Sequence, residues 1–230
     1  MKVIAIIPAG GKGIRSGLPA PKQYLKFNGR ELIAYTIGVF QKNKLVNEII
    51  IAAEKQYHPV IEQLRIKYNF TKIKKIVEGG KERQDSVFNA LSFVEAGKND
   101  LIVVHDAARP LLPQEVLSEA ISTAAVKGNA LVCLKSKDTV VQGKKYVESY
   151  LNRDKIFNVQ TPQIFKYKDL KYAMEKAYNE NFCGTDESVL IKRIGKRIHI
   201  VEGSMLNFKV TTKNDISLLK MILSGNSERK

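Results

Sequence analysis

The N-terminal stretch decides the fold, and it consists of Val3-Ile4-Ala5-Ile6-Ile7-Pro8-Ala9-Gly10-Gly11-Lys12-Gly13-Ile14-Arg15, with Pro21-Lys22-Gln23 soon after it. The continuous apolar run predicts a strand that is buried on both faces. Glycines that follow such a strand leave backbone N–H groups open to a ligand, which suits phosphate. Arg15 and Lys22 would add positive charge there. The stretch therefore predicts the triphosphate-binding part of a nucleotide site.

Length and composition indicate an ordinary soluble globular protein rather than a membrane or secreted one. The chain has 230 residues, of which 44% are hydrophobic, and we expect one domain over residues 1–230. No apolar run approaches the roughly 18 residues of a membrane helix, and the N-terminus lacks the features of a signal peptide. Cys133 and Cys183 have no metal-binding spacing and are expected to be reduced thiols. We therefore expect a cytoplasmic protein with no membrane partner.

The net charge of +15 is compatible with nucleic acid, a membrane surface or small anionic substrates. The lysines are spread along the chain, and no zinc finger, helix-turn-helix or aromatic RNA-binding signature accompanies them. This distribution favours small polyphosphate substrates and no nucleic-acid partner. A basic nucleic-acid-binding module remains an alternative, and it predicts binding that weakens steeply with salt.

The first two thirds of the chain alternate between predicted strands and predicted helices. Strands are expected at residues 46–53, 73–77, 101–104 and 130–134, and helices at residues 31–40, 59–68, 82–95 and 113–127. This alternation predicts a Rossmann-like α/β fold, with a mostly parallel central sheet and helices on both faces. The loops that follow the strands then meet at one edge of the sheet, where ligands bind. The candidate loops are residues 9–15, 79–86 and 106–110.

Residues 137–157 break this alternation. Two short predicted strands, at 138–141 and 146–150, flank a polar tip at 142–145. A lone two-stranded arm is marginal in water, so we expect this protruding β-hairpin to pack on another surface, such as a second subunit.

Beyond the arm, we predict helices at 167–178 and 215–222 and strands at 197–201 and 208–210. Another helix is expected to begin at 185–187, with Thr185 as its cap.

The glycine loop fits three kinds of nucleotide site unequally. No Walker A motif is present. A dinucleotide fingerprint has its first two glycines but Ser16 in place of the third, and the acidic residue expected after the second strand comes late, at Glu54. An arginine inside the loop suits a triphosphate better than a nicotinamide cofactor. A nucleotidyltransferase is therefore favoured, and a dehydrogenase remains a weaker alternative.

Nine short motifs follow one another along nearly the whole chain: Pro8-Ala9-Gly10-Gly11-x-Gly13-x-Arg15, Pro21-Lys22-Gln23-Tyr24, Gly79-Gly80-x-Glu82-Arg83-x-Asp85-Ser86-Val87, His105-Asp106-Ala107-Ala108-Arg109-Pro110, Asp138-Thr139, Arg153, Thr161-Pro162-Gln163-x-Phe165, Thr185-Asp186-Glu187 and Asn207-Phe208-Lys209-Val210-Thr211. In these motifs and their order the chain resembles the 2-C-methyl-D-erythritol 4-phosphate cytidylyltransferases of the non-mevalonate isoprenoid pathway. That family belongs to the sugar-nucleotidyltransferase superfamily.

The resemblance implies transfer of CMP from CTP to methylerythritol phosphate, with release of pyrophosphate and assistance from Mg²⁺ or another divalent cation. The acceptor phosphate attacks the α-phosphorus, so positioning and charge stabilisation do most of the catalysis. Arg15 and Lys22 match the transition-state stabilisers, and Arg153 and Lys209 match the pair that positions the acceptor. Asp106 matches a residue beside both metal and substrate.

Further positions match residues that bind the two substrates. Those expected to bind CTP are Ala9, Gly10, Gly11, Gly13, Gly80, Lys81, Arg83, Ser86 and Ala107, and those expected to contact the acceptor through hydroxyls are Thr139, Thr161 and Thr185. Arg83 could equally form an ion pair on a helix face, and each threonine could be a cap or strand residue. His105 is expected to be a packed or hydrogen-bonded structural residue, because an anionic phosphate needs no general base.

The resemblance also implies a homodimer in which the arm is exchanged, so that Arg153 completes the partner's active site. The nearest alternative function is a ribitol-5-phosphate cytidylyltransferase, which shares the fold and CTP. Ala108 and the triplet Thr185-Asp186-Glu187 favour methylerythritol phosphate over ribitol phosphate.

Overall fold

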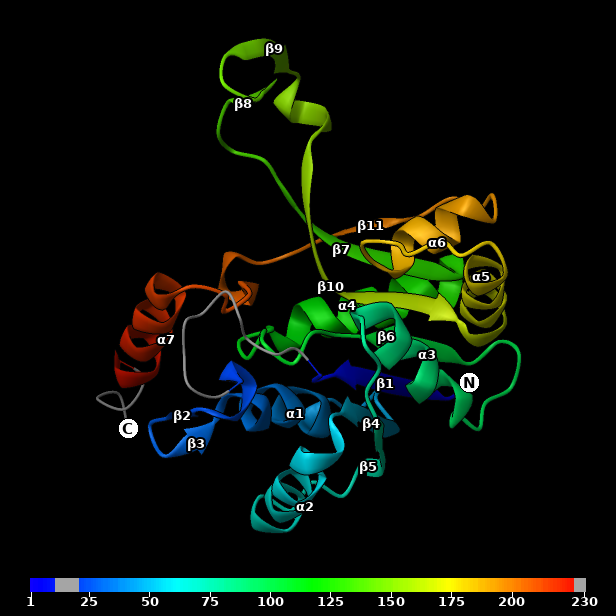
Figure 1. Cartoon of the computed structure of the whole chain (residues 1–230), viewed down its shortest axis with the longest axis vertical. Helices are drawn as coiled ribbons and strands as arrows, with labels where there is room; N and C mark the ends of the chain where they lie inside the picture. The colour runs from blue at the N-terminus through cyan, green and yellow to red at the C-terminus, as the bar shows by residue number, and fades with distance from the viewer. Residues whose placement is uncertain (11–20, 226–230) are drawn as a thin grey trace.

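The computed structural model, which describes residues 1–10 and 21–225, has a seven-stranded central sheet (Figure 1). The strand order is β11-β7-β10-β6-β1-β4-β5. The strands are β1 Val3–Pro8, β4 Glu48–Ala53, β5 Ile73–Glu78, β6 Leu101–Val104, β7 Asn129–Lys135, β10 Phe157–Lys166 and β11 Ile200–Glu202. β10 is antiparallel to both neighbours, and the other pairings are parallel. The predicted Rossmann-like fold is confirmed.

Helices cover both faces of this sheet. On one face α1 Leu32–Lys42, α2 His58–Lys67 and α4 Gln114–Lys127 share an apolar core with Ala5 and Ile7 of β1. On the other face α3 Arg83–Ser92, α5 Tyr167–Asn179 and α6 Glu187–Arg193 share a second core with Ile4 and Ile6. Successive strand residues point to opposite faces, so two apolar layers require an uninterrupted apolar run.

The path of the chain around β1 determines which edge of the sheet can bind ligands. From β1 the chain goes outward to β4 and β5, and it then returns to form β6 on the opposite side of β1. The loops that leave the carboxyl ends of β1 and β6 therefore run in different directions, and such a switch point opens a crevice for ligands. Ala9 and Gly10 follow β1, and His105 and Asp106 follow β6.

Strand β10 was not predicted from the sequence. It lies between β7 and β6, and its pairing with β7 shifts register between Val159 and Gln163. The polar residues and the proline of Gln160-Thr161-Pro162 hide the strand pattern in the sequence. Such irregularities often redirect side chains beside functional sites. Because Gln163 pairs with Val104, Thr161 lies just beyond the end of β6.

The arm forms a separate two-stranded sheet of β8 Val140–Gly143 and β9 Val147–Leu151, as predicted, and it protrudes from the body (Figure 1). At another end of the molecule, α7 Lys213–Gly225 packs beside the hairpin of β2 Lys26–Phe27 and β3 Arg30–Glu31. None of the described helices is long and apolar enough to cross a membrane.

The strand predicted at residues 208–210 is wrong. These residues pair with no strand of the described chain, and the Val210 N–H donates a hydrogen bond to the Ala108 carbonyl at 2.9 Å. Val210 is buried against Leu219 of α7 and Phe27 of β2. Its apolar character therefore reflects a second, small core rather than pairing in the sheet. This contact places the preceding residue, Lys209, beside the loop after β6.

Candidate active site

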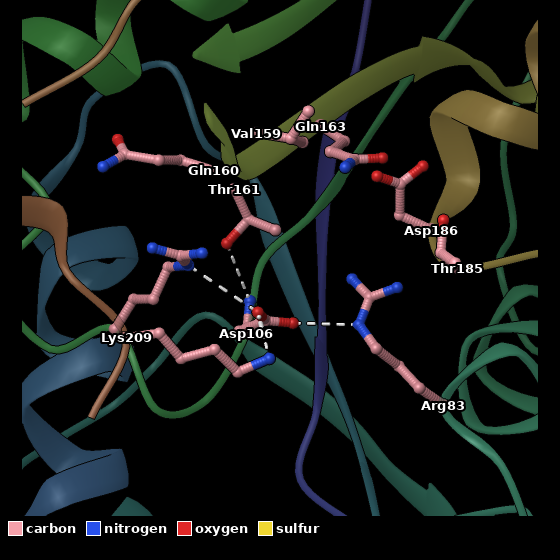
Figure 2. Close-up of a pocket in the computed structure, with 10 residues that line it drawn as sticks. Arg83, Asp106, Val159, Gln160, Thr161, Gln163, Thr185, Asp186 and Lys209 are labelled. Carbon is pink, nitrogen blue, oxygen red and sulfur yellow. Dashed lines mark hydrogen bonds and ion pairs between the residues drawn. The ribbon is translucent and has the colours of Figure 1, made fainter. Parts of the chain in front are cut away.

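Asp106 is the centre of a buried cluster of charges at the carboxyl end of β6. Its Oδ1 lies 2.9 Å from Arg83 Nε, and its Oδ2 lies 2.8 Å from Lys209 Nζ and 3.6 Å from Arg109 Nε (Figure 2). Burial alone would raise the pKa of this carboxyl, but Arg83 and Lys209 hold the pKa well below its usual range. Asp106 therefore remains an anion and gathers three cations at one point.

The side chain of Arg83 bridges Asp106, which follows β6, and Glu187, at the start of α6. It is the first residue of α3, whose start is fixed by a capping box between Glu82 and Asp85. Its Nη1 also donates to both carboxylate oxygens of Glu187, at 2.7 and 2.8 Å. Glu187 is only 1% exposed; burial raises the pKa of its carboxyl, and Arg83 opposes that rise. The guanidinium therefore lies between two buried carboxylates.

The charge of this cluster suits an anionic ligand. Among the described residues, ion pairs join Arg83, Arg109 and Lys209 to two carboxylates, Asp106 and Glu187, which leaves one positive charge in excess within these pairs. A third carboxylate, Asp186, lines the pocket beside them and caps α6. The Arg83 Nη2 group is buried and has no hydrogen-bond partner among residues 1–10 and 21–225. A buried donor without a partner is costly, and an acceptor oxygen that reached this group would relieve that cost.

A polar pocket opens beside the cluster (Figure 2). Its lining comes from the loop after β6, the middle of β10, the start of α3, the residues just before α6 and the segment before α7. The lining residues are Arg83, Asp106, Arg109, Val159, Gln160, Thr161, Gln163, Thr185, Asp186 and Lys209. Positive charge with several hydroxyl and amide groups is the chemistry expected for a phosphorylated polyol.

Neighbouring hydrogen bonds hold the cluster in place. Arg109 Nη1 donates to the Asn207 carbonyl at 2.7 Å, and Asn207 Nδ2 donates to the Thr161 carbonyl at 2.7 Å. The loop after β6, the irregular part of β10 and the segment that carries Lys209 are thereby tied together.

His105 lies beneath Asp106 and is fully buried. Its Nε2 lies 3.1 Å from the Arg109 carbonyl, and its Nδ1 lies 3.0 Å from Thr161 Oγ1. Burial lowers the pKa of His105 to about 4, so the ring is neutral at ordinary pH. The prediction of a packed, hydrogen-bonded histidine is confirmed.

The segment 79–86 lies beside the end of β1, as predicted for the loops of one sheet edge. The Ser86 hydroxyl accepts from the Gly80 N–H at 3.0 Å and donates to the Glu82 carbonyl at 3.1 Å. A Cβ on Gly80 would lie 2.1 Å from Asp85 Cβ, so a larger residue does not fit there. A Cβ on Gly10 would lie 3.4 Å from Ser86 Oγ. The side chain of Lys81 is exposed.

Part of the predicted triphosphate loop can be placed. Gly11, Gly13 and Arg15 lie outside the described residues. Lys22 begins a short 3₁₀ turn, Lys22–Tyr24, and Gln23 Nε2 donates to the Ala9 carbonyl at 2.7 Å. This bond keeps the turn beside the end of β1.

Two predicted acceptor contacts lie away from the pocket. Thr139 and Arg153 are exposed residues of the arm, and Arg153 Nη1 donates only to the Lys137 carbonyl, at 3.3 Å, within the described part of the chain. The structure thus brings together Arg83, Asp106, Thr161, Thr185 and Lys209. It leaves the two arm residues apart from them.

Sequence reasoning missed some of the local roles. The cap of α6 is Asp186, whose carboxylate accepts from the Val189 N–H at 3.1 Å, and not Thr185. The Ala107 carbonyl also has a structural contact, because it accepts from the buried Thr36 hydroxyl at 2.8 Å. Arg109 and Glu187 were given no role, although both stand inside motifs that were recognised.

The described residues fit a protein-bound Mg²⁺ poorly. Both oxygens of Asp106 already face cationic donors, and residues 1–10 and 21–225 contain no group of three His, Cys, Asp or Glu side chains that could hold a metal ion. Three cations crowd the Asp106 carboxylate, and they would repel a divalent ion that approached it as a direct ligand.

The chain matches known proteins over nearly its whole length. Residues 3–225 match the sequence model of the family described as 2-C-methyl-D-erythritol 4-phosphate cytidylyltransferase. The enzyme of that name from Geotalea uraniireducens is 38% identical over 237 residues, which cover 100% of both chains. Its counterpart from Geobacter metallireducens is 38% identical over 227 residues, which cover 97% of this chain and 98% of the relative.

Solved structures give the same result for the fold. The 4-diphosphocytidyl-2C-methyl-D-erythritol synthase from Anaerococcus prevotii is 30% identical, with a TM-score of 0.86 over 97% of this chain and 96% of its own. The 2-C-methyl-D-erythritol 4-phosphate cytidylyltransferase of Francisella tularensis is 30% identical, with a TM-score of 0.81 over 96% of this chain and 99% of its own.

Proposed function

This chain belongs to the 2-C-methyl-D-erythritol 4-phosphate cytidylyltransferase family, and we propose that the pocket beside Asp106 is where its acceptor substrate binds. The protein is a nucleotidyltransferase: it joins CTP and 2-C-methyl-D-erythritol 4-phosphate to give 4-diphosphocytidyl-2-C-methyl-D-erythritol. Pyrophosphate is the leaving group that balances this reaction. The observation that carries the assignment of the pocket is its cluster of three cations around one buried carboxylate.

The attacking group in this reaction is a phosphate oxygen, which is already an anion. The site therefore has to bring two anions together and stabilise the charge of the transferring group, and it needs no base. Lys209, together with the partnerless Nη2 of Arg83, would attract the acceptor phosphate. Asp106 would hold these cations in position rather than take part in the chemistry.

CTP is proposed to bind along the edge formed by the end of β1 and the segment 79–86. Ser86 and the backbone of Gly10 and Gly80 lie side by side at this edge, where they would offer a hydroxyl and backbone groups to the base and ribose. Lys22 starts a turn that is tied to the end of β1, which favours a role beside the triphosphate. Arg15 is proposed for the same role from its place in the motif.

A divalent cation is proposed to arrive with CTP. Mg²⁺ commonly keeps several waters and binds substrate phosphates with few protein ligands. That mode agrees with the poor fit of Asp106 as a direct ligand. When bound, the ion would neutralise charge on the phosphate oxygens.

A homodimer is proposed to complete the pocket with Arg153 and Thr139 from a second chain. The arm that carries both residues has exposed apolar side chains, including Tyr146 and Tyr150. A two-stranded hairpin of this kind is marginal by itself, so packing against another chain would stabilise it. A cytoplasmic location is also proposed, and the free thiols of Cys133 and Cys183 agree with it.

Pyrophosphate release tests the proposed function directly. The purified protein is given each of the four nucleoside triphosphates with methylerythritol phosphate, and CTP with ribitol 5-phosphate as the matched acceptor. We expect fast release only with CTP and methylerythritol phosphate. Faster turnover of ribitol phosphate would contradict the acceptor, and equal turnover of the other nucleotides would contradict the nucleotide site.

A further inference from the structure

Two threonines line the pocket, and their hydroxyl groups differ in what they already contact (Figure 2). Thr161 Oγ1 accepts from the Asp106 N–H at 3.1 Å and lies 3.0 Å from His105 Nδ1. The hydroxyl of Thr185 has no hydrogen-bond partner within the described part of the chain. From the sequence, both residues are expected to contact the acceptor through their hydroxyls, but in the structure the hydrogen-bond partners of these hydroxyls differ.

The direction of the Thr161 hydrogen bond follows from the histidine beneath it. His105 Nε2 faces the Arg109 carbonyl at 3.1 Å, and a carbonyl oxygen can only accept. Nε2 must therefore carry the ring hydrogen. In a neutral imidazole Nδ1 then has only a lone pair, so it accepts from the Thr161 hydroxyl.

The Thr161 oxygen thus has one hydrogen and one lone pair in use. The hydrogen goes to His105, and the lone pair accepts from the backbone of Asp106, the residue that gathers Arg83, Arg109 and Lys209. Donation to a substrate phosphate would require the hydroxyl to give up its bond to His105. That would leave Nδ1 of a fully buried ring without a partner, which is costly.

We propose that Thr161 is a positioning residue that acts through Asp106 and His105, and that it does not donate a hydrogen bond to the acceptor substrate. Of the two pocket threonines, only Thr185 keeps a hydroxyl hydrogen for that purpose. This inference rests on the proposed function of the pocket for its consequence in catalysis. The hydrogen-bond relay itself rests on the geometry alone.

The tautomer of His105 is the first test, and it needs no substrate. The chain has three histidines, so ¹⁵N NMR of ring-labelled protein, with His58→Gln and His199→Gln used for assignment, resolves the His105 signals. We expect Nε2 to carry the hydrogen and Nδ1 to be a hydrogen-bonded acceptor at neutral pH. An Nδ1–H tautomer or a protonated ring would overturn the relay.

Substitution of the two threonines is the second test. Thr161→Val removes the hydroxyl at nearly constant shape, Thr161→Ser keeps it, and Thr185→Val is the matched control in the same pocket. We expect Thr161→Val to lower kcat about tenfold to hundredfold and to shift the His105 Nδ1 signal. Thr161→Ser should restore both, and Thr185→Val should raise the KM of the acceptor without shifting that signal.

Two results would contradict the proposal. One is a Thr161→Val enzyme whose only defect is in the KM of the acceptor, with the His105 signals unchanged. The other is a Thr185→Val enzyme that shifts the His105 signals as strongly as Thr161→Val. If the unmodified enzyme released no pyrophosphate with any acceptor, the proposed function would fail, whereas the NMR signals would still decide the relay.

Discussion

The pocket and the arm hold the proposed acceptor-binding residues in opposite surroundings. In the pocket Asp106 is 7% exposed and is held by three cations and a threonine hydroxyl. On the arm Tyr146 is 77% exposed, and Arg153 has one long bond to a backbone carbonyl within the described chain. The side chains of the pocket therefore hold one another in place within one chain, whereas the arm is proposed to depend on contacts from a second chain.

This difference bears on how the two regions contribute to binding. The side chains of such a cluster are already ordered by their ion pairs, so they lose little conformational freedom when an anion binds. Little of the binding free energy is then lost to ordering them. An exposed arginine loses rotamer freedom on binding unless another surface orders it first. Substitutions in the pocket should consequently have the larger effects, and substitutions on the arm should depend on the state of assembly.

The largest expected effect is that of Lys209→Met. It removes the ammonium group 2.8 Å from Asp106 and, with it, the excess positive charge of the cluster. We expect kcat/KM for the acceptor to fall about a hundredfold to a thousandfold, as is common when one charge-stabilising donor is lost. Steady-state pyrophosphate release at varied acceptor concentration measures it.

Lys213→Met is the matched control for that substitution. Lys213 is an exposed residue at the start of α7, four positions later, and the same change there should leave activity within about twofold. Near-normal activity of Lys209→Met, or an equal loss in both variants, would remove Lys209 from the acceptor site.

Arg153→Ala tests the role of the arm, and its expected effect is the next largest. Loss of a charge-assisted hydrogen bond to phosphate should lower kcat/KM for the acceptor about tenfold to a hundredfold, and CTP binding should change little. Lys155→Ala, in the same 3₁₀ turn and also exposed, is the control and should behave as the unmodified enzyme. A defect mainly in CTP binding would be the contrary result.

Mixing the two defective enzymes sharpens this comparison. In a mixed dimer of Lys209→Met with Arg153→Ala, one pocket keeps Lys209 and receives an intact Arg153 from the other chain if the arms are exchanged. Activity should then rise well above that of either variant alone. No rescue, with mixed dimers verified by mass, would argue against exchange of the arm.

Most of the central fold was predictable because its elements have simple patterns. Apolar runs such as Val3–Pro8 mark strands that are buried on two faces, and the alternation with helices fixes a mostly parallel sheet. Strand β10 was missed because its pairing depends on distant strands, while its own residues are polar around Pro162. The strand expected at 208–210 failed for the opposite reason, because a small core can bury an extended segment without pairing it.

The residues of the site were predictable from the sequence, but their contacts with one another were not. The motifs pointed to Asp106, Lys209 and Arg83, yet the sequence cannot show that one carboxylate would hold these two cations together with a third, that of Arg109. Glu187 was expected only to begin a helix, since nothing local indicates that its side chain is buried against Arg83. Partners more than a hundred residues apart are set by the fold as a whole.

Glu187→Ala should show how much the buried ion pair beside the pocket contributes to the free energy of unfolding. Removal of one member of a buried ion pair leaves Arg83 short of a partner, which typically lowers the free energy of unfolding by about 3 to 5 kcal/mol. Glu187→Gln should cost less because it can still accept a hydrogen bond. The control, Glu180→Ala, breaks the exposed ion pair with Arg193 and should change the midpoint of urea unfolding little.

The free energy of unfolding should also depend on pH through His105, which lies beneath Asp106. Burial lowers the pKa of His105 from 6.5 to about 4, so between these values the unfolded chain binds a proton that the folded chain does not. The free energy of unfolding must therefore fall as the pH falls through this window, by about 3 kcal/mol from this residue. His105→Gln should lack that part of the decline, and parallel curves for the two proteins would contradict it.

The smallest expected effect is that of Tyr150→Ala on the arm. Tyr150 is 74% exposed, so within one chain its removal should change the free energy of unfolding by no more than about 0.5 kcal/mol. If the arm packs on a second chain, the same change should weaken self-association, seen as a higher dimer dissociation constant in sedimentation at falling protein concentration. An equal dissociation constant for Tyr150→Ala and the unmodified protein would mean that this face of the arm is not part of the interface. A large loss of stability in the monomer would instead mean that the arm packs on its own chain, and the contrast between a self-supported pocket and a dependent arm would be lost.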